Sequence, residues 1–206
     1  MRLVLATSNP YKLVEVREIL QPAGFEVVAL DSYERSFEEP LEDGQTFEEN
    51  ARIKARGYAA QLGEWCVAED SGLEVDALDG QPGVHSARFA GEAGSRDERD
   101  ARNNQKLLEL LRGVVPERRT ARFVCVMCVA APDGSLIAEA RGTYEGRIAE
   151  APRGSNGFGY DPLLWLPELG VTSAELSSQE KHARSHRGKA ARALAERLRE
   201  LAGSGR

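Results

Sequence analysis

Cysteine is scarce in this chain, with three residues among 206. A small and odd number of cysteines argues against a framework of structural disulfides and suits a reducing compartment. Cys125 and Cys128 form a C-x-x-C pair, but both lie in an apolar run from Phe123 to Val129 that predicts a buried strand. Residues three apart in a strand point to opposite faces, so we expect core thiols without a metal or redox role.

Long apolar runs and surplus positive charge are missing too. No stretch approaches the roughly 20 apolar residues of a membrane span, and the opening run from Leu3 to Ala6 is shorter than the apolar core of a signal peptide. The formal net charge is −6, which argues against a wide basic surface for nucleic acid. We therefore expect a cytoplasmic protein that binds neither a membrane nor nucleic acid, although a few focused lysines can still bind a small anion.

The pattern that is present predicts a mixed α/β protein. At 206 residues, 41% of them hydrophobic and 29% charged, the chain suits one compact body or two intimate lobes. It opens with an apolar run, a helical spacing from Leu13 to Leu20 that Gly24 ends, and a second strand pattern. This strand, helix and strand order is typical of α/β folds.

Later segments carry sharper local signals. Thr46 with Glu49 and Ser95 with Glu98 are capping boxes, each of which opens a helix. Two β-rich runs around Asp133-Gly134 predict a hairpin. The expected helices are residues 47–62, 96–112 and 186–201, and the expected strands are 3–6, 25–30, 65–68, 73–75, 122–131 and 136–144, with a sharp turn at 69–72 and irregular structure at 154–162.

The loop between the first strand and helix is the first candidate site. Free backbone N–H groups at a helix start favour an anion, and short hydroxyls with Lys12 add donors. The alternative is that Ser8 or Asn9 only caps the helix while Lys12 is solvated. Neither glycine-rich nucleotide motif, G-x-x-x-x-G-K-[ST] or G-x-G-x-x-G, is present.

Carboxylates form the second candidate. Glu42-Asp43 lies in an acidic loop, and Glu69-Asp70 follows a hydrophobic strand. Carboxylates that converge repel each other, and a hard divalent cation that also bridges phosphate oxygens relieves the repulsion. The alternative is that these side chains simply face water.

Two further clusters lie near the C-terminus. Glycines in the run from Gly157 to Asp161 allow close approach of a ligand, and an aromatic face can stack on a base; a packed turn is the alternative. Lys181 and the segment 185–189 concentrate donors before the last helix, which also suits a solvated helix start. His186 has no nucleophile to serve, so we interpret it as a hydrogen-bonding residue for a ligand, and we expect His85 and His182 to be structural or exposed.

Six blocks follow one another along the chain. They are Thr7-Ser8-Asn9-Pro10-Tyr11-Lys12, Thr46-Phe47-Glu48-Glu49-Asn50-Ala51, Glu69-Asp70-Ser71-Gly72-Leu73, Pro82-Gly83-Val84-His85-Ser86-Ala87-Arg88, Gly157-Phe158-Gly159-Tyr160-Asp161-Pro162 and Ser185-His186-Arg187-Gly188-Lys189-Ala190. In this order they resemble the inosine triphosphatase family, pyrophosphatases of non-standard purine nucleoside triphosphates. The resemblance runs from residue 3 to about 200, with His85 in place of a common tyrosine and Glu69 where some members have Asp.

The resemblance implies one two-lobed domain over residues 1–206, with an elongated mixed central sheet, flanking helices and a nucleotide cleft between the lobes. It implies a homodimer and a Mg²⁺-dependent reaction in which ITP, dITP or XTP and water give the monophosphate and pyrophosphate. Two alternatives remain: a regulatory nucleotide-binding module, which would not need Glu42 and Asp70, and a sequence-specific nucleic-acid binder, which the charge of −6 disfavours.

The resemblance also implies roles for individual residues. Asp70 is the base that activates water and, with Glu42, a metal ligand. Ser8, Asn9 and Lys12 grip the phosphates, and Lys54 reaches them. The other residues assigned to substrate are Thr7, Pro10, Tyr11 and Ser71, together with Phe158, Gly159, Tyr160, Asp161, Lys181, His186 and Arg187 around the base.

Overall fold

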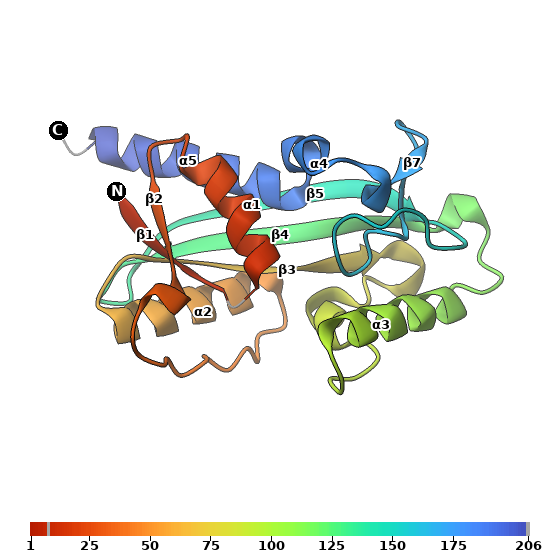
Figure 1. Cartoon of the computed structure of the whole chain (residues 1–206), viewed down its shortest axis with the longest axis horizontal. Coiled ribbons are helices and arrows are strands. Elements are labelled where there is room, and N and C mark those ends of the chain that lie inside the picture. Colours follow the sequence, from red (N-terminus) through yellow and green to blue (C-terminus); the bar gives the residue numbers. More distant parts are fainter. Residues whose placement is uncertain (8, 205–206) are drawn as a thin grey trace. The chain divides into compact units, whose positions relative to one another are not determined.

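The computed structural model describes residues 1–7 and 9–204 and has an α/β architecture (Figure 1). Seven strands form one mixed sheet in the order β2-β1-β3-β4-β5-β6-β7. The α-helices are α1 (Pro10–Leu20), α2 (Phe47–Leu62), α3 (Arg96–Leu110), α4 (Ser178–Arg184) and α5 (His186–Ser204). The strands are β1 (Arg2–Ala6), β2 (Glu26–Ala29), β3 (Cys66–Val75), β4 (Thr120–Ala130), β5 (Leu136–Ile148), β6 (Leu164–Leu166) and β7 (Val171–Thr172).

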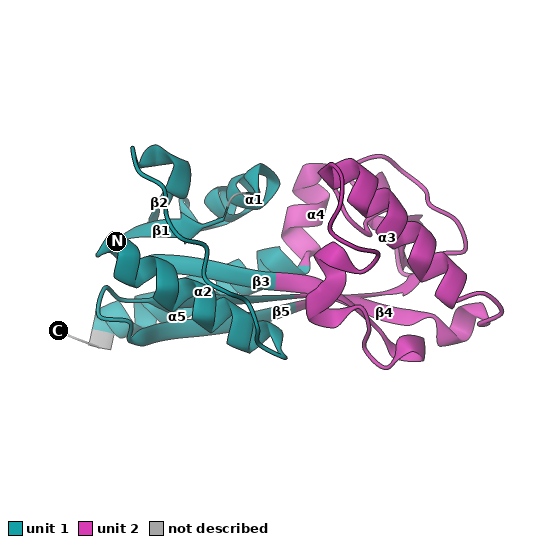
Figure 2. Ribbon diagram, turned by 90° about the horizontal axis from the view of Figure 1, so that it is seen from below, with its two compact units in different colours: residues 1–70, 125–142, 186–206 teal, residues 71–124, 143–185 magenta. Residues whose placement is uncertain are grey.

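The sheet is mixed, as expected. Strand β1 runs parallel to both β2 and β3, whereas β6 runs antiparallel to β5 and to β7. The chain divides into two compact units, coloured separately in Figure 2. Unit 1 comprises Met1–Asp70, Cys125–Gly142 and His186–Arg206, and unit 2 comprises Ser71–Val124 and Thr143–Ser185.

The core of unit 1 lies where α1 and α5 pack side by side (Figure 1). Leu3 and Leu5 of β1 are fully buried against Leu20 of α1. Leu194 and Leu198, one turn apart on α5, complete the cluster. Ala190 lies one turn before them and is also buried, so apolar residues spaced by four positions form the buried face of this helix.

The core of unit 2 is built around α3. Leu107 and Leu111 are fully buried, and they pack in one cluster with Tyr144 and Tyr160. Leu107 and Leu111 lie at the C-terminal end of α3, so this cluster packs that end of the helix with Tyr160 of the glycine-rich segment.

Helix starts confirm the capping predictions. Both side-chain bonds of the Thr46 and Ser95 capping boxes are present. Gly63 ends α2 in the left-handed conformation at φ 69°, which glycine adopts without a steric penalty. The hairpin is also confirmed, since Gly134 and Ser135 turn the chain between β4 and β5 with Ala131 N–H bonded to Ser135 O at 2.9 Å.

The predicted sharp turn at residues 69–72 is wrong, because β3 runs through it without a break. Gly72 is required there by close approach rather than by a turn. A Cβ at this position would lie 2.3 Å from Ser86 Oγ and 2.6 Å from Gly83 O. Glycine inside a strand often marks such an approach by another backbone.

Two further expectations concern cysteines and membranes. Cys66, Cys125 and Cys128 are free and buried, which confirms the prediction of core thiols. Across the part of the chain that the structure describes, none of the helices combines the length and the apolar character needed to cross a membrane.

Candidate active site

The two neighbouring carboxylates on β3 have different surroundings, because successive side chains of a strand point to opposite faces. Glu69 is 2% exposed. Its Oε1 accepts from Lys12 Nζ at 2.8 Å, and its carboxylate accepts from Arg187 Nε at 2.7 Å and Nη2 at 3.0 Å. Such a fork is the favoured geometry for an arginine and a carboxylate.

The Arg187 guanidinium also donates from Nη1 to Glu15 Oε2 at 2.5 Å. Two cations, Lys12 and Arg187, thus balance two anions, Glu15 and Glu69, inside unit 1. Burial alone would raise the pKa of Glu69, but the Arg187 and Lys12 charges outweigh it and hold that pKa below its ordinary value.

This placement bears on the predicted role of Arg187. The residue is 1% exposed, and Nε, Nη1 and Nη2 all donate to carboxylates. A guanidinium bonded in this way holds Glu69 in position, so we add a positioning role for Arg187 in the proposal below. Its predicted place around the base stays a prediction.

Asp70 lies in a half-buried position with an amide beside it. Its Oδ2 accepts from Asn50 Nδ2 at 3.1 Å. Burial raises the pKa of Asp70, Lys54 and Lys12 oppose that rise, and the Glu42 charge adds to it. Titratable groups with environments of this kind cluster at functional sites.

Glu42 is brought toward Asp70 by contacts with α2. Lys54 Nζ lies 2.8 Å from Glu42 Oε2 and donates to the backbone oxygen of Glu69 at 3.3 Å. Asn50 Oδ1 accepts from Gly44 N at 2.9 Å, which fixes the loop that carries Glu42. Asn50 therefore links this loop to Asp70.

These residues suit Mg²⁺. Among the described residues no three His, Cys, Asp or Glu side chains gather as a metal cage. Magnesium is usually held by only one or two carboxylates together with waters and substrate phosphates. Glu42 and Asp70, whose charges influence each other, match that smaller donor set.

The predicted phosphate loop precedes α1. Asn9 caps the helix, with its Oδ1 accepting from Tyr11 N at 3.1 Å, and Pro10 is the first helical residue. Thr7 Oγ1 accepts from Asn9 N at 3.1 Å, and Tyr11 is 54% exposed. Ser8 lies outside the described residues. Asn9 N and Tyr11 N are thus bonded within the loop and Pro10 has no N–H, so Asn9 caps the helix, as the capping alternative expects, and the positive end of the helix dipole remains. Binding of an anion at this loop stays a prediction.

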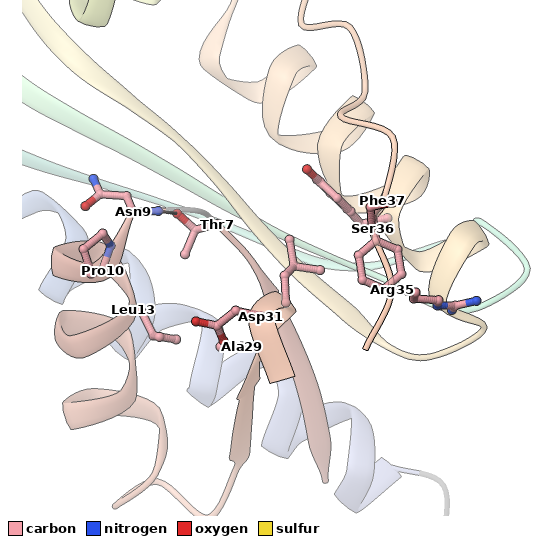
Figure 3. Close-up of a pocket in the computed structure, with 11 residues that line it drawn as sticks. Thr7, Asn9, Pro10, Leu13, Ala29, Asp31, Arg35, Ser36 and Phe37 are labelled. Atoms are coloured by element: carbon pink, nitrogen blue, oxygen red, sulfur yellow. Dashed lines mark hydrogen bonds between the residues drawn. The ribbon is translucent and has the colours of Figure 1, made fainter. Parts of the chain in front are cut away.

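A pocket of about 370 Å³ borders this loop on the side of β2 (Figure 3). Thr7, Asn9 and Pro10 line it, with Phe37 and Tyr58 among the other lining residues. None of the acidic candidates is among its 11 lining residues. The carboxylates therefore face a different part of unit 1.

The predicted base-binding segment belongs to unit 2 and is organised by Asp161. This buried carboxylate accepts from Phe158 N at 2.9 Å, from Ser173 Oγ at 2.7 Å and from Lys181 Nζ at 2.5 Å. A Cβ on Gly157, which has φ 79°, would lie 2.1 Å from Asp161 Oδ2. The glycine is therefore needed for the closeness of this turn.

The aromatic residues of this segment are held differently. Tyr160 is buried and donates its hydroxyl to Ser86 O at 2.8 Å, which makes it a packing residue. Phe158 is half-buried, with Lys181 Nζ 5.0 Å and Arg96 Cζ 4.6 Å from its ring centroid. Phe158 is thus less buried than Tyr160 and has two cations near its ring.

The remaining candidates are Ser71 and His186. Ser71 follows Asp70 on β3 and is half-buried. His186 is buried at the first position of α5. A Cβ on Gly142 would lie 2.2 Å from the His186 backbone oxygen, so β5 closely approaches this helix start.

Four residues that contact these groups carried no assignment from sequence. Asn50 contacts Asp70, and Arg96, Asp100 and Asn104 of α3 contact the base-binding segment. Asn50 lies within the block 46–51 that carries the family resemblance, so the sequence did contain a signal that could have identified it as a candidate site residue. The spacing 96, 100 and 104 marks one helix face, but only the tertiary structure shows what that face contacts.

Comparison with known proteins gives consistent matches. A model described as the Ham1 family matches residues 3–197. A dITP/XTP pyrophosphatase of Nitratidesulfovibrio vulgaris is 54% identical over 196 residues, which cover 94% of each chain. A dITP/XTP pyrophosphatase of Thermus thermophilus is 49% identical and covers 95% of this chain and 91% of the relative.

Solved structures agree with this match. A HAM1 protein from Coxiella burnetii superimposes with a TM-score of 0.86 at 40% identity, over 97% of this chain and 99% of that chain. A dITP/XTP pyrophosphatase from Mycobacterium abscessus has a TM-score of 0.76 at 43% identity, over 98% of this chain and all of that chain.

Proposed function

The chain belongs to the Ham1 family, and from that membership we propose that it is a dITP/XTP pyrophosphatase. The reaction cleaves the anhydride between the α- and β-phosphates of ITP, dITP or XTP. Water supplies the oxygen and protons, and the products are the monophosphate and pyrophosphate. Such hydrolysis removes non-standard purines before polymerases can use them.

Unit 1 carries the residues proposed for the triphosphate. A triphosphate has about four negative charges, and phosphoryl-type transfer depends mostly on positioning and charge neutralisation. Lys12 and Lys54 supply ammonium groups, and the start of α1 supplies the positive end of the helix dipole. Glu69 and Arg187, buried and fixed, hold Lys12 in place.

Asp70 is proposed as the base. A carboxylate with a raised pKa accepts a proton more readily than one with an ordinary pKa, and burial raises that of Asp70. Glu42 and Asp70 would hold Mg²⁺, which neutralises phosphate charge and favours ionisation of water when bound. Asn50 orients the Asp70 carboxylate.

Unit 2 carries the residues proposed for the base. Phe158 would stack on the purine, while Lys181 and the glycine-rich backbone supply donors for the 6-oxo group that hypoxanthine and xanthine share. Adenine has an amino group at that position, so the same donors would lose their partner. A site built around such bonds can reject the wrong ligand by about 10⁴.

The Asp70 environment is the single observation that carries the mechanism. Its test is a panel of ITP, dITP, XTP, GTP and ATP with Mg²⁺, in which pyrophosphate and orthophosphate are measured separately. We expect pyrophosphate from the first three and little product from ATP. Orthophosphate as the main product would contradict cleavage between the α- and β-phosphates.

Two other outcomes would replace the proposal. Tight binding of ITP without any product would indicate a regulatory module, and salt-sensitive binding of an oligonucleotide would revive a nucleic-acid role. The single domain, the nucleotide cleft, the homodimer and the cytoplasmic location stay predictions.

A further inference from the structure

One face of α3 touches the base-binding segment at every turn. Arg96, Asp100 and Asn104 are spaced by four residues, so they share a face and lie one above the other. All three belong to unit 2, as does the segment they contact. Their contacts with that segment are made to Phe158 and Gly159.

Asp100 and Asn104 form hydrogen bonds with both backbone polar groups of Gly159, its N–H and its C=O. Gly159 N donates to Asp100 Oδ2 at 2.8 Å, and Gly159 O accepts from Asn104 Nδ2 at 2.9 Å. Gly159 has φ 63°, a conformation that glycine adopts at low cost. Asp100 and Asn104, one helical turn apart, match the separation of this N–H and C=O.

The third member of the face acts on the ring. Arg96 Cζ lies 4.6 Å from the Phe158 ring centroid, and Arg96 Nε lies 3.8 Å from Asp100 Oδ2. A guanidinium over an aromatic face is attractive and directional. The same helix face thus contacts the Phe158 ring and the backbone of the next residue.

Asp161 restrains the segment from its other side. It accepts from Phe158 N at 2.9 Å and pairs with Lys181 at 2.5 Å. Phe158 therefore lies between two anchors, Asp161 within the segment and Gly159 fixed to α3. Removing the second anchor leaves the first intact, which allows the two to be tested separately.

We propose that Asp100 and Asn104 are positioning residues that hold the Gly159 peptide, and thereby set the purine selectivity of Phe158 and its neighbours. This inference rests on the proposed function, because it needs the segment to contact the base. Selectivity depends on buried donors meeting the 6-oxo group, and displacement of those donors weakens the distinction between a carbonyl and an amino group. Asp100 and Asn104 act through Gly159 and touch no reacting atom.

The test compares kcat/KM for ITP and for ATP in Asp100→Ala and Asn104→Ala. Loss of a charged hydrogen bond changes an equilibrium constant about tenfold or more, and loss of a neutral one changes it somewhat less. We expect the ITP to ATP ratio to fall about tenfold in Asp100→Ala and about fivefold in Asn104→Ala. The loss should appear as a higher KM for ITP with nearly unchanged kcat, since Asp70 and Lys12 are untouched.

Two matched variants separate this role from general damage to the helix. Asp100→Asn keeps an oxygen that can accept from Gly159 N, so it should retain most of the selectivity that Asp100→Ala loses. Gln105→Ala removes an exposed side chain that bonds only to Glu109 on the same helix, and it should match the wild type. An unchanged ratio in Asp100→Ala, or an equal loss in Gln105→Ala, would overturn the inference.

A second readout needs no substrate. Hydrogen exchange of the Gly159 amide, measured by NMR on the free protein, should accelerate about tenfold in Asp100→Ala and little in Asp100→Asn. An unchanged exchange rate in Asp100→Ala would overturn the proposed anchoring of Gly159 by α3, whatever the activity of the variant. If the wild type releases no pyrophosphate from ITP, the proposed function fails, and faster exchange still supports the anchoring of Gly159 by α3.

Discussion

Glu69 and Asp70 are neighbours on β3, yet their surroundings shift the pKa values of the two carboxylates in opposite directions. On one face, two cations hold the pKa of Glu69 down; on the other, burial raises the pKa of Asp70. Glu69 is thus a permanent anion that fixes Lys12 and Arg187. Asp70 is the group proposed to accept a proton. If that proposal holds, one strand supplies both a scaffold charge and a reactive one.

Removal of the reactive charge should give the largest effect. Asp70→Asn keeps the shape of the side chain but cannot accept a proton, so kcat should fall by about 10²–10⁴, the usual range for losing a general base. The measurement is pyrophosphate release from ITP at saturating Mg²⁺. Asp43→Asn, on an exposed residue beside Glu42, is the matched control and should remain active. A fully active Asp70→Asn enzyme would remove the distinction between the two faces.

Removal of the scaffold charge should mainly lower stability. Glu69→Gln leaves Lys12 and Arg187 with one buried anion, Glu15, and breaking a buried ion pair costs about 3–5 kcal/mol. Urea unfolding at neutral pH measures the loss. A double-mutant cycle with Arg187→Met checks the cause, because the two effects should be far from additive if the residues act together.

The stability that Glu69 supplies through its ion pair with Arg187 depends on pH in a defined direction. A carboxylate with a lowered folded pKa stabilises the protein above its ordinary pKa, which is 4.5 for a glutamate, and this contribution is lost as the pH falls further. The wild type should therefore lose stability below about pH 4.5, and Glu69→Gln should lose less over the same range. Parallel curves for the two proteins would show that Glu69 is not a scaffold anion.

Replacement of Lys12 tests whether this residue, which pairs with Glu69, also contributes to substrate binding. Lys12→Ala should weaken ITP binding about 10- to 100-fold, the usual value of a charged hydrogen bond, and weaken binding of the monophosphate less. Calorimetry with both ligands in the presence of Mg²⁺ measures this, and Lys106→Ala, in unit 2, serves as a control. Equal losses for both ligands would mean that Lys12 does not contact the outer phosphates.

The smallest expected effect is a slight gain in stability when Asp70 is replaced, whereas replacement of Glu69 should lower stability. Because its pKa is raised in the folded state, ionised Asp70 lowers stability as the pH rises through that pKa. Asp70→Asn, measured without added Mg²⁺ at neutral pH, should therefore unfold at a slightly higher temperature than the wild type. Glu69→Gln should unfold at a lower one. A fall in both variants would contradict the contrast between the two faces.

Local signals in the sequence predicted much of the fold. The capping boxes at Thr46 and Ser95, the Asp133-Gly134 hairpin and the apolar spacing of α5 all depend on residues close in sequence. The short helix α4 begins at a further box, Ser177 with Glu180, which carries the same kind of signal. The strands β6 and β7 have only three and two residues, too few for a clear alternation.

The error at residues 69–72 has a tertiary cause. Polar residues and a glycine favour a turn locally, but Gly72 makes room for Ser86 Oγ and Gly83 O, a contact between segments over ten residues apart. The partners of Arg187 were missed for the same reason. Nothing near Arg187 in sequence indicates that it pairs with Glu69 and Glu15.

The sequence by itself determined the α/β class, most helix and strand positions and the chemical types of the candidate residues, because capping, periodicity and motif order are local properties. Tertiary structure decided that the pKa of Glu69 is lowered and that of Asp70 is raised. It also decided that α3 holds the Gly159 peptide. Those outcomes depend on burial and on partners from distant segments, and a linear pattern contains no measure of either.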